Sequence, residues 1–137
     1  MRGSDRRMET LIQLAIITIT MLALDGTWLT ATVATSRRLF AAIQGKPLQV
    51  RWEPAVAVYV LMIAAVWFFA VRPASGWQEA AALGAALGFV MYGLYDLTNL
   101  ATLSAYTLQF AITDMLWGTT LFAVSAGLAA AYQINGS

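Results

Sequence analysis

Four long apolar runs divide the chain, and short polar or turn-forming stretches separate them. A helix needs roughly 20 consecutive apolar residues to cross the hydrocarbon core of a bilayer, and each run meets that length. The pattern therefore predicts four membrane spans, at about residues 10–35, 54–72, 78–103 and 107–131.

The residues between the runs indicate how the spans are joined. Pro54 suits the first turn of the second span, where its missing N–H has no helical partner, and Pro73 lies where that span should stop. Only a few residues separate the third and fourth spans, so these two are expected to form an antiparallel hairpin. We predict an all-α fold, a single domain over residues 1–137 built as a four-transmembrane-helix antiparallel bundle.

The first run also resembles a signal peptide, because the polar and basic stretch "MRGSDRRMET" precedes it. However, the apolar segment continues past Asp25 to about Ala34, which is long enough to span a bilayer. We interpret it as the first membrane span.

Composition supports an integral, multi-pass membrane protein whose main partner is the lipid bilayer. Hydrophobic residues make up 60% of the chain and charged residues only 11%, too few to cover a water-exposed surface. The net charge of +1 provides no basic surface, so nucleic acid is not expected as a partner. The type of membrane is not indicated.

Several kinds of chemistry are excluded because the chain contains no Cys and no His. Disulfides, thiolate nucleophiles, iron–sulfur clusters, His-ligated haem and His- or Cys-ligated zinc all need one of them. The only lysine, Lys46, lies in a polar connection, which argues against a Schiff base within the membrane. We expect no cofactor and no metal; a carboxylate-only Mg²⁺ or Ca²⁺ site would require acids from several spans to converge.

The orientation in the membrane is not set by the positive-inside rule. An even number of spans puts both termini on one side, and the basic residues divide equally between the two sides. The terminal side holds Arg2, Arg6, Arg7 and Arg72, and the other side holds Arg37, Arg38, Lys46 and Arg51.

Small residues recur at four-residue spacing on the third span, at Ala80, Gly84 and Gly88. Such a row lets helix backbones approach one another in lipid. Continuing the row by four residues gives Tyr92 and then Asp96, so we expect Asp96 to extend the packing face rather than point at lipid.

Three aspartates lie inside predicted spans, namely Asp25, Asp96 and Asp114. Each costs roughly 2.5–3.5 kcal/mol near the centre of a span, so all three need partners or water. With a rise of about 1.5 Å per residue, they lie about 16, 12 and 10 Å from the span ends nearest the 1–2 and 3–4 connections. We predict one cluster at a common depth that holds a shared proton or a bound cation, with Asn99 as a further polar group.

Other side chains are expected at comparable depth and could support an ion- or substrate-binding site. They are Tyr59, Tyr92, Thr98, Thr113, Trp28 and Trp117. The alternative interpretation is that the polar groups only hydrogen-bond one another and fix the register of the helices. Both interpretations remain open.

Four stretches resemble an uncharacterised family of small, predicted four-span membrane proteins, domain of unknown function 2177. The stretches are "LDGTWL" (24–29), "FAVRPA" (69–74), "YDLTNLATL" (95–103) and "DMLWG" (114–118). The likeness covers about residues 11–131 and implies one four-span domain, with Asp25, Asp96, Asn99 and Asp114 as the polar motif positions. The chain departs from the family where a Trp-Pro pair often follows the third stretch, because it reads "SAYTLQF" there. No activity comes with the resemblance.

Three functions fit these features. The first is transport or conductance of a proton, a cation or a small solute by a homo-oligomer, with the buried carboxyls as ligands. The second is a non-catalytic accessory or structural subunit of a larger membrane complex. The third, a lipid-modifying membrane enzyme, is the least favoured because no nucleophile or metal-ligand set accompanies the acids.

Overall fold

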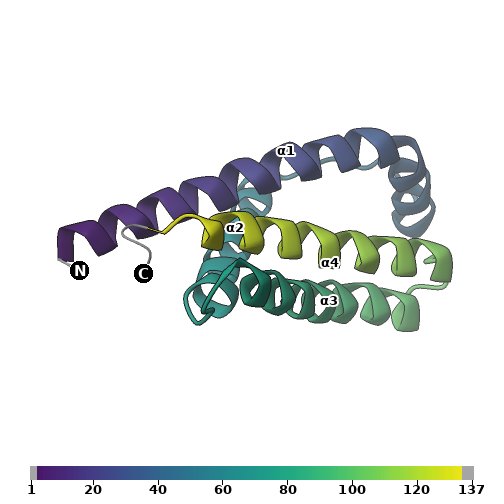
Figure 1. Cartoon of the computed structure of the whole chain (residues 1–137). Helices are drawn as coiled ribbons and strands as arrows, with labels where there is room; N and C mark the ends of the chain where they lie inside the picture. The colour runs from purple at the N-terminus through teal and green to yellow at the C-terminus, as the bar shows by residue number, and fades with distance from the viewer. Residues whose placement is uncertain (1–2, 134–137) are drawn as a thin grey trace.

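The computed structural model describes residues 3–133, and this part of the chain is helical with no strand (Figure 1). The elements in order are α1 (Gly3–Gln44), α2 (Trp52–Ala65), the π-helical η1 (Val66–Val71), α3 (Trp77–Thr102) and α4 (Leu108–Ala131). With η1 continuing α2, four helical segments are long and apolar enough to cross a membrane. The predicted all-α, four-helix class is confirmed.

Helices α3 and α4 lie side by side and form the most extensive interface of the described chain (Figure 1). Glycines allow this close approach. A Cβ atom added to Gly84 would lie 2.5 Å from the carbonyl oxygen of Phe122, and one added to Gly88 would lie 2.3 Å from that of Gly118. No side chain larger than hydrogen fits there, so the two backbones are in direct contact. In lipid, where there is no hydrophobic driving force between helices, this close van der Waals packing holds the two helices together.

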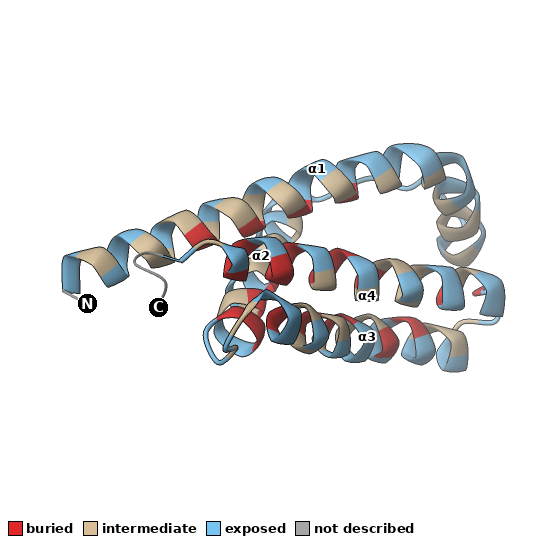
Figure 2. Cartoon of the chain, in the orientation of Figure 1, coloured by how far each residue is buried: buried red, intermediate tan, exposed pale blue. Residues whose placement is uncertain are grey.

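Helix α4 is the central helix, since it packs against α1, α3 and η1. Figure 2 shows its buried residues on the sides that face its neighbours. Most are small or apolar: Ala111, Gly118, Leu121, Phe122, Ser125, Ala126, Gly127, Ala129 and Ala130.

Helix α1 buries a single row of side chains at four-residue spacing, Gln13, Ile17, Met21 and Asp25. The two apolar members sit between two polar ones. Four-residue spacing places all of them on one narrow face, and that face is turned toward the rest of the protein. The polar residues at its ends must therefore find partners on other helices.

The first helix extends well beyond the predicted span of 10–35. It continues through residues 36–44, which the sequence pattern had assigned to the connection, and ends at Gly45. This glycine adopts a φ of +72° and donates its N–H to the carbonyl of Ala41 at 2.9 Å. A left-handed residue that closes a last turn in this way is a common helix terminator, and glycine adopts it without strain.

The final turns of α1 are anchored by an aromatic contact with the connection between α3 and α4. The ring of Phe40 meets those of Tyr106 and Phe110 edge to face, with centroids 6.3 and 6.1 Å apart. Figure 1 shows this end of α1 bending toward the start of α4. Phe40 thus packs these turns against the α3–α4 hairpin. Hydropathy along the sequence does not reveal such a contact between distant residues.

The second span changes from α-helix to π-helix at Val66, and the N–H of Arg72 closes the last wide turn on the carbonyl of Trp67 at 2.8 Å. The guanidinium of Arg72 lies 3.8 Å from the centroid of the Phe68 ring. Trp67 donates its indole N–H to the Gln13 side chain at 3.2 Å. The π-helical stretch therefore contains the tryptophan that satisfies one polar end of the buried row on α1.

We predict that Gly88→Ala destabilises the protein by at least about 2 kcal/mol, because the new methyl would overlap backbone atoms of α4 that cannot move aside. Thermal unfolding of the purified protein in detergent, followed by circular dichroism, measures this. Gly26→Ala is the matched control, since nothing lies within 4 Å of a Cβ at Gly26. Equal melting temperatures for the two variants would contradict the close α3–α4 contact.

Candidate functional site

Asp25 is held by one donor from each of two other helices. Its carboxyl, 8% exposed, accepts a hydrogen bond from the hydroxyl of Tyr59 on α2. Its other oxygen accepts from the indole N–H of Trp117 on α4 at 3.1 Å. Trp28, one turn beyond Asp25, stacks on Trp117 with centroids 4.8 Å apart and planes 5° from parallel. Both donors are neutral, so the environment of Asp25 supplies hydrogen bonds but no opposite charge.

Asp96 is completely buried and has a single donor. The hydroxyl of Tyr106, in the α3–α4 connection, donates to its Oδ1. Its Oδ2 accepts no hydrogen bond from the described residues. Asn99, one turn further along α3, interacts with Tyr106 and Tyr95. A buried carboxyl oxygen without a donor is costly and indicates that something else satisfies it.

Asp114 on α4 lies within hydrogen-bonding reach of Asp96 and within electrostatic range of Asp25. No basic side chain among residues 3–133 forms an ion pair with it. Two carboxyl groups in contact are both acceptors when ionised and repel one another. The Asp96–Asp114 contact therefore brings two acceptors together, with no donor from residues 3–133 at the Asp96 Oδ2.

Tyr92 on α3 lies within electrostatic range of all three aspartates and of Tyr59. Its ring lies directly over Gly118, where an added Cβ would come within 2.2 Å of the ring carbons. Gly118 thus makes the room in α4 that lets a tyrosine of α3 reach the acids.

The structure brings most of the sequence-predicted site residues together, on all four helices. Asp25, Asp96, Asp114, Asn99, Tyr59, Tyr92, Trp28 and Trp117 are linked by the contacts above. Thr113 is exposed and lines a cavity next to Asp114. Thr98 does not join them, since it is exposed on the surface of α3 and its carbonyl accepts a hydrogen bond from Thr102.

Two polar partners escaped the sequence interpretation. Tyr106 lies just beyond the end of a span, where the pattern only indicated a tight connection. Gln13 lies in the first apolar run and, besides accepting from Trp67, donates to the carbonyl of Tyr132 at 3.0 Å. Its signal was a lone amide inside an otherwise apolar run.

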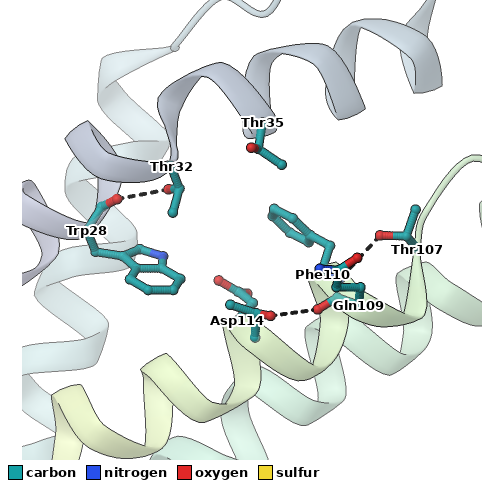
Figure 3. Close-up of a pocket in the computed structure, with 8 residues that line it drawn as sticks. Trp28, Thr32, Thr35, Thr107, Gln109, Phe110 and Asp114 are labelled. Carbon is teal, nitrogen blue, oxygen red and sulfur yellow. Dashed lines mark hydrogen bonds between the residues drawn. The ribbon is translucent and has the colours of Figure 1, made fainter.

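Asp114 borders two cavities. One, of about 250 Å³, lies between α1 and α4, with Trp28, Thr32 and Thr35 on one side and Phe110 and Asp114 on the other (Figure 3). The second, of about 400 Å³, is mainly apolar. Its lining residues are Val58, Met62, Met91, Tyr92, Tyr95 and Asp114. The carboxyl of Asp114 is therefore the one acid of the cluster that both cavities reach.

The acids do not form a set of ligands for one metal ion. Within residues 3–133, no three His, Cys, Asp or Glu side chains converge closely enough to hold one. Asp25 is satisfied by Tyr59 and Trp117, while Asp96 and Asp114 pair with each other. The arrangement suits a proton or a monovalent cation better than a divalent ion, which takes six or more oxygen ligands.

We predict that Tyr106→Phe lowers the free energy of unfolding by about 1–3 kcal/mol, because it removes the one described donor to a fully buried carboxyl. Tyr132→Phe is the control, since the Tyr132 hydroxyl forms no hydrogen bond with residues 3–133. Chemical unfolding in mixed micelles compares the two variants. A loss in Tyr132→Phe as large as that in Tyr106→Phe would contradict the assigned hydrogen bond.

Comparison with known proteins agrees with this architecture. The model of the family described as "Predicted membrane protein (DUF2177)" matches residues 10–131, which include the apolar parts of all four membrane-spanning helices and the aspartates 25, 96 and 114. No curated protein and no solved structure matches the chain. The chain is an integral membrane protein and belongs to the DUF2177 family of predicted membrane proteins.

Proposed function

We propose that this membrane protein is a transport or conductance protein whose carboxyl cluster binds and transfers protons. Asp25, Asp96 and Asp114 are the proton-binding groups, and Asn99 and the tyrosines are their neutral partners. The observation that carries the proposal is the contact between Asp96 and Asp114, together with the Asp96 oxygen that no described donor reaches. A shared proton satisfies that oxygen and removes the repulsion between the two carboxyls.

The distribution of hydroxyl groups supports proton transfer rather than a purely structural role. The hydroxyls of Tyr59 and Tyr106 donate to Asp25 and Asp96, and Tyr92 lies within electrostatic range of all three acids. A hydroxyl both accepts and donates a proton. Two of the three acids thus have a hydroxyl partner that can take part in proton transfer, as in relays of ionisable residues in membrane proteins.

A structural network has a simpler solution that this chain does not use. If the polar groups served only helix association, neutral amide and hydroxyl pairs would satisfy one another without placing carboxyls in contact. Here two acids adjoin and no described base compensates them. Retaining a like-charged pair inside the membrane is costly, which favours a function for the exchangeable proton between them.

We also propose that the pathway is completed by a homo-oligomer. The cavities beside Asp114 have volumes of only about 250 and 400 Å³ and are bordered by two or three helices each. Four spans are few for a transport pathway within one chain, and small membrane proteins commonly complete one by self-association.

We predict that infrared spectroscopy detects a protonated carboxyl at neutral pH in the parent protein. In Asp114→Asn this band should change in frequency or intensity, because one of the two carboxyls that share the proton is replaced by an amide. Asp5→Asn, which alters a carboxyl in the first turn of α1, should leave the band unchanged. An identical band in the parent and in Asp114→Asn would show that the two acids do not share a proton.

We predict that the protein, reconstituted in liposomes with an internal pH-sensitive dye, passes protons down an imposed gradient. Asp96→Asn should reduce this flux at least tenfold, since an amide cannot hold the exchangeable proton. Asp5→Asn provides the matched control, and size-exclusion chromatography verifies that each variant is folded. An Asp96→Asn protein that is folded and passes protons like the parent would refute the proposal.

A further inference from the structure

The cavity between α1 and α4 has the features of a site for a positively charged ligand. Asp114 contributes a carboxyl, and the rings of Trp28 and Phe110 lie on either side of it (Figure 3). Trp117 covers one face of the Trp28 indole, which fixes the ring in position. A carboxylate flanked by aromatic faces attracts cations through its charge and through cation–π interactions.

The threonines of the cavity add acceptors. The hydroxyl of Thr32 donates to the carbonyl of Trp28 at 2.9 Å (Figure 3). The hydroxyl of Thr113 donates to the carbonyl of Gln109 at 2.8 Å. Their hydrogens are thus engaged within their own helices, while the oxygens keep lone pairs free to accept. No Lys or Arg of the described chain lines this cavity.

Size and ligand chemistry narrow the class of ligand. The volume of about 250 Å³ is below that of sites for drug-sized molecules, so the ligand is small. An anion is disfavoured by the carboxyl. A divalent metal ion is disfavoured too, because the acids of the described chain do not converge as a ligand set. A small organic cation uses both the charge and the aromatic faces.

We propose that the cavity between α1 and α4 binds a small quaternary or protonated ammonium ion, with Asp114 as its counter-charge and Trp28 and Phe110 as its aromatic walls. The ion exchanges with the proton that Asp114 shares with Asp96. The exchange rests on the proposed function, because Asp114 would bind both the proton and the ammonium ion. The cation site by itself depends only on the cavity.

The exchange follows from charge balance. The titratable groups that face the pair are Asp25 on α1, Tyr59 on α2, Tyr92 and Tyr95 on α3 and Tyr106 in the α3–α4 connection, and none of them is a base. The pair therefore keeps a proton when the cavity holds no cation. A cation beside Asp114 supplies the same positive charge and favours release of that proton, so binding should be tighter at higher pH and should release protons.

The test uses the full-length protein in detergent and choline chloride as the probe. Isothermal titration calorimetry at constant ionic strength should detect choline binding, with sodium chloride as the reference. The neutral isostere 3,3-dimethylbutan-1-ol should bind at least tenfold more weakly. Asp114→Asn should weaken choline binding at least tenfold and Phe110→Leu at least threefold, while Asp5→Asn should bind like the parent. Titrations in buffers of different ionisation enthalpy measure the released protons.

The outcomes are distinguishable. Absence of choline binding, equal binding of the neutral isostere, or an Asp114→Asn variant that is folded and binds like the parent would overturn the cation site. Phe110→Leu keeps the carboxyl, so it tests the aromatic wall even if Asp114→Asn fails to fold. Binding without proton release would overturn the exchange alone. The parent protein could pass protons, lose this flux in Asp96→Asn, and yet not bind choline. That result would support the proposed function and overturn only the cation site.

Discussion

The structure depends on one constraint: a polar group inside a bilayer must find its hydrogen-bond partner within the protein, because lipid offers none. Helix α1 shows the consequence. Its buried row ends in Gln13 and Asp25, about 18 Å apart along the helix axis. Gln13 bonds to Trp67 of η1 and to Tyr132 at the end of α4, and Asp25 bonds to Tyr59 of α2 and Trp117 of α4. The helix is thus fixed at two depths to the same two partner segments, which sets both its tilt and its register.

The α3–α4 hairpin obeys a different requirement, and the two together create the site. Gly84 and Gly88 let the backbones of the hairpin touch, while Gly118 leaves space for the ring of Tyr92. That close approach brings Asp96 of α3 and Asp114 of α4 into contact. A wider spacing would separate the carboxyls and let lipid or water between them. The small residues therefore position the acids as well as stabilise the helices.

The sequence was sufficient for the class of fold and for the composition of the cluster, for physical reasons. Hydropathy and span length reveal membrane helices, and an aspartate inside a span is rare enough to be noticed. The helical period then shows that Asp96 continues the Gly84–Gly88 row. What the sequence did not show depends on pairing between distant segments. The extension of α1 to Gln44 needs the contact of Phe40 with Tyr106 and Phe110, and Tyr106 becomes a partner of Asp96 only once the connection folds back over α3. Thr98 shares the polar run of α3 with Asp96 and Asn99, but two residues along a helix turn a side chain by about 200° and put it on the exposed surface.

The charge of the site is the strongest reason to regard it as functional. A membrane protein that uses a carboxyl only for structure can pair it with Arg or Lys, or give each of its oxygens a hydrogen-bond donor. Asp25 has the second arrangement, since Tyr59 and Trp117 each donate to one of its oxygens. Asp96 and Asp114 follow neither, since they adjoin each other and Asp96 has one described donor for two oxygens. In the proposed function the missing positive charge comes from outside the described chain, as a proton or a small cation. A charge that is not covalently part of the protein can leave and be replaced. Because Asp114 borders two cavities, the proposal makes that exchange the elementary step of transport.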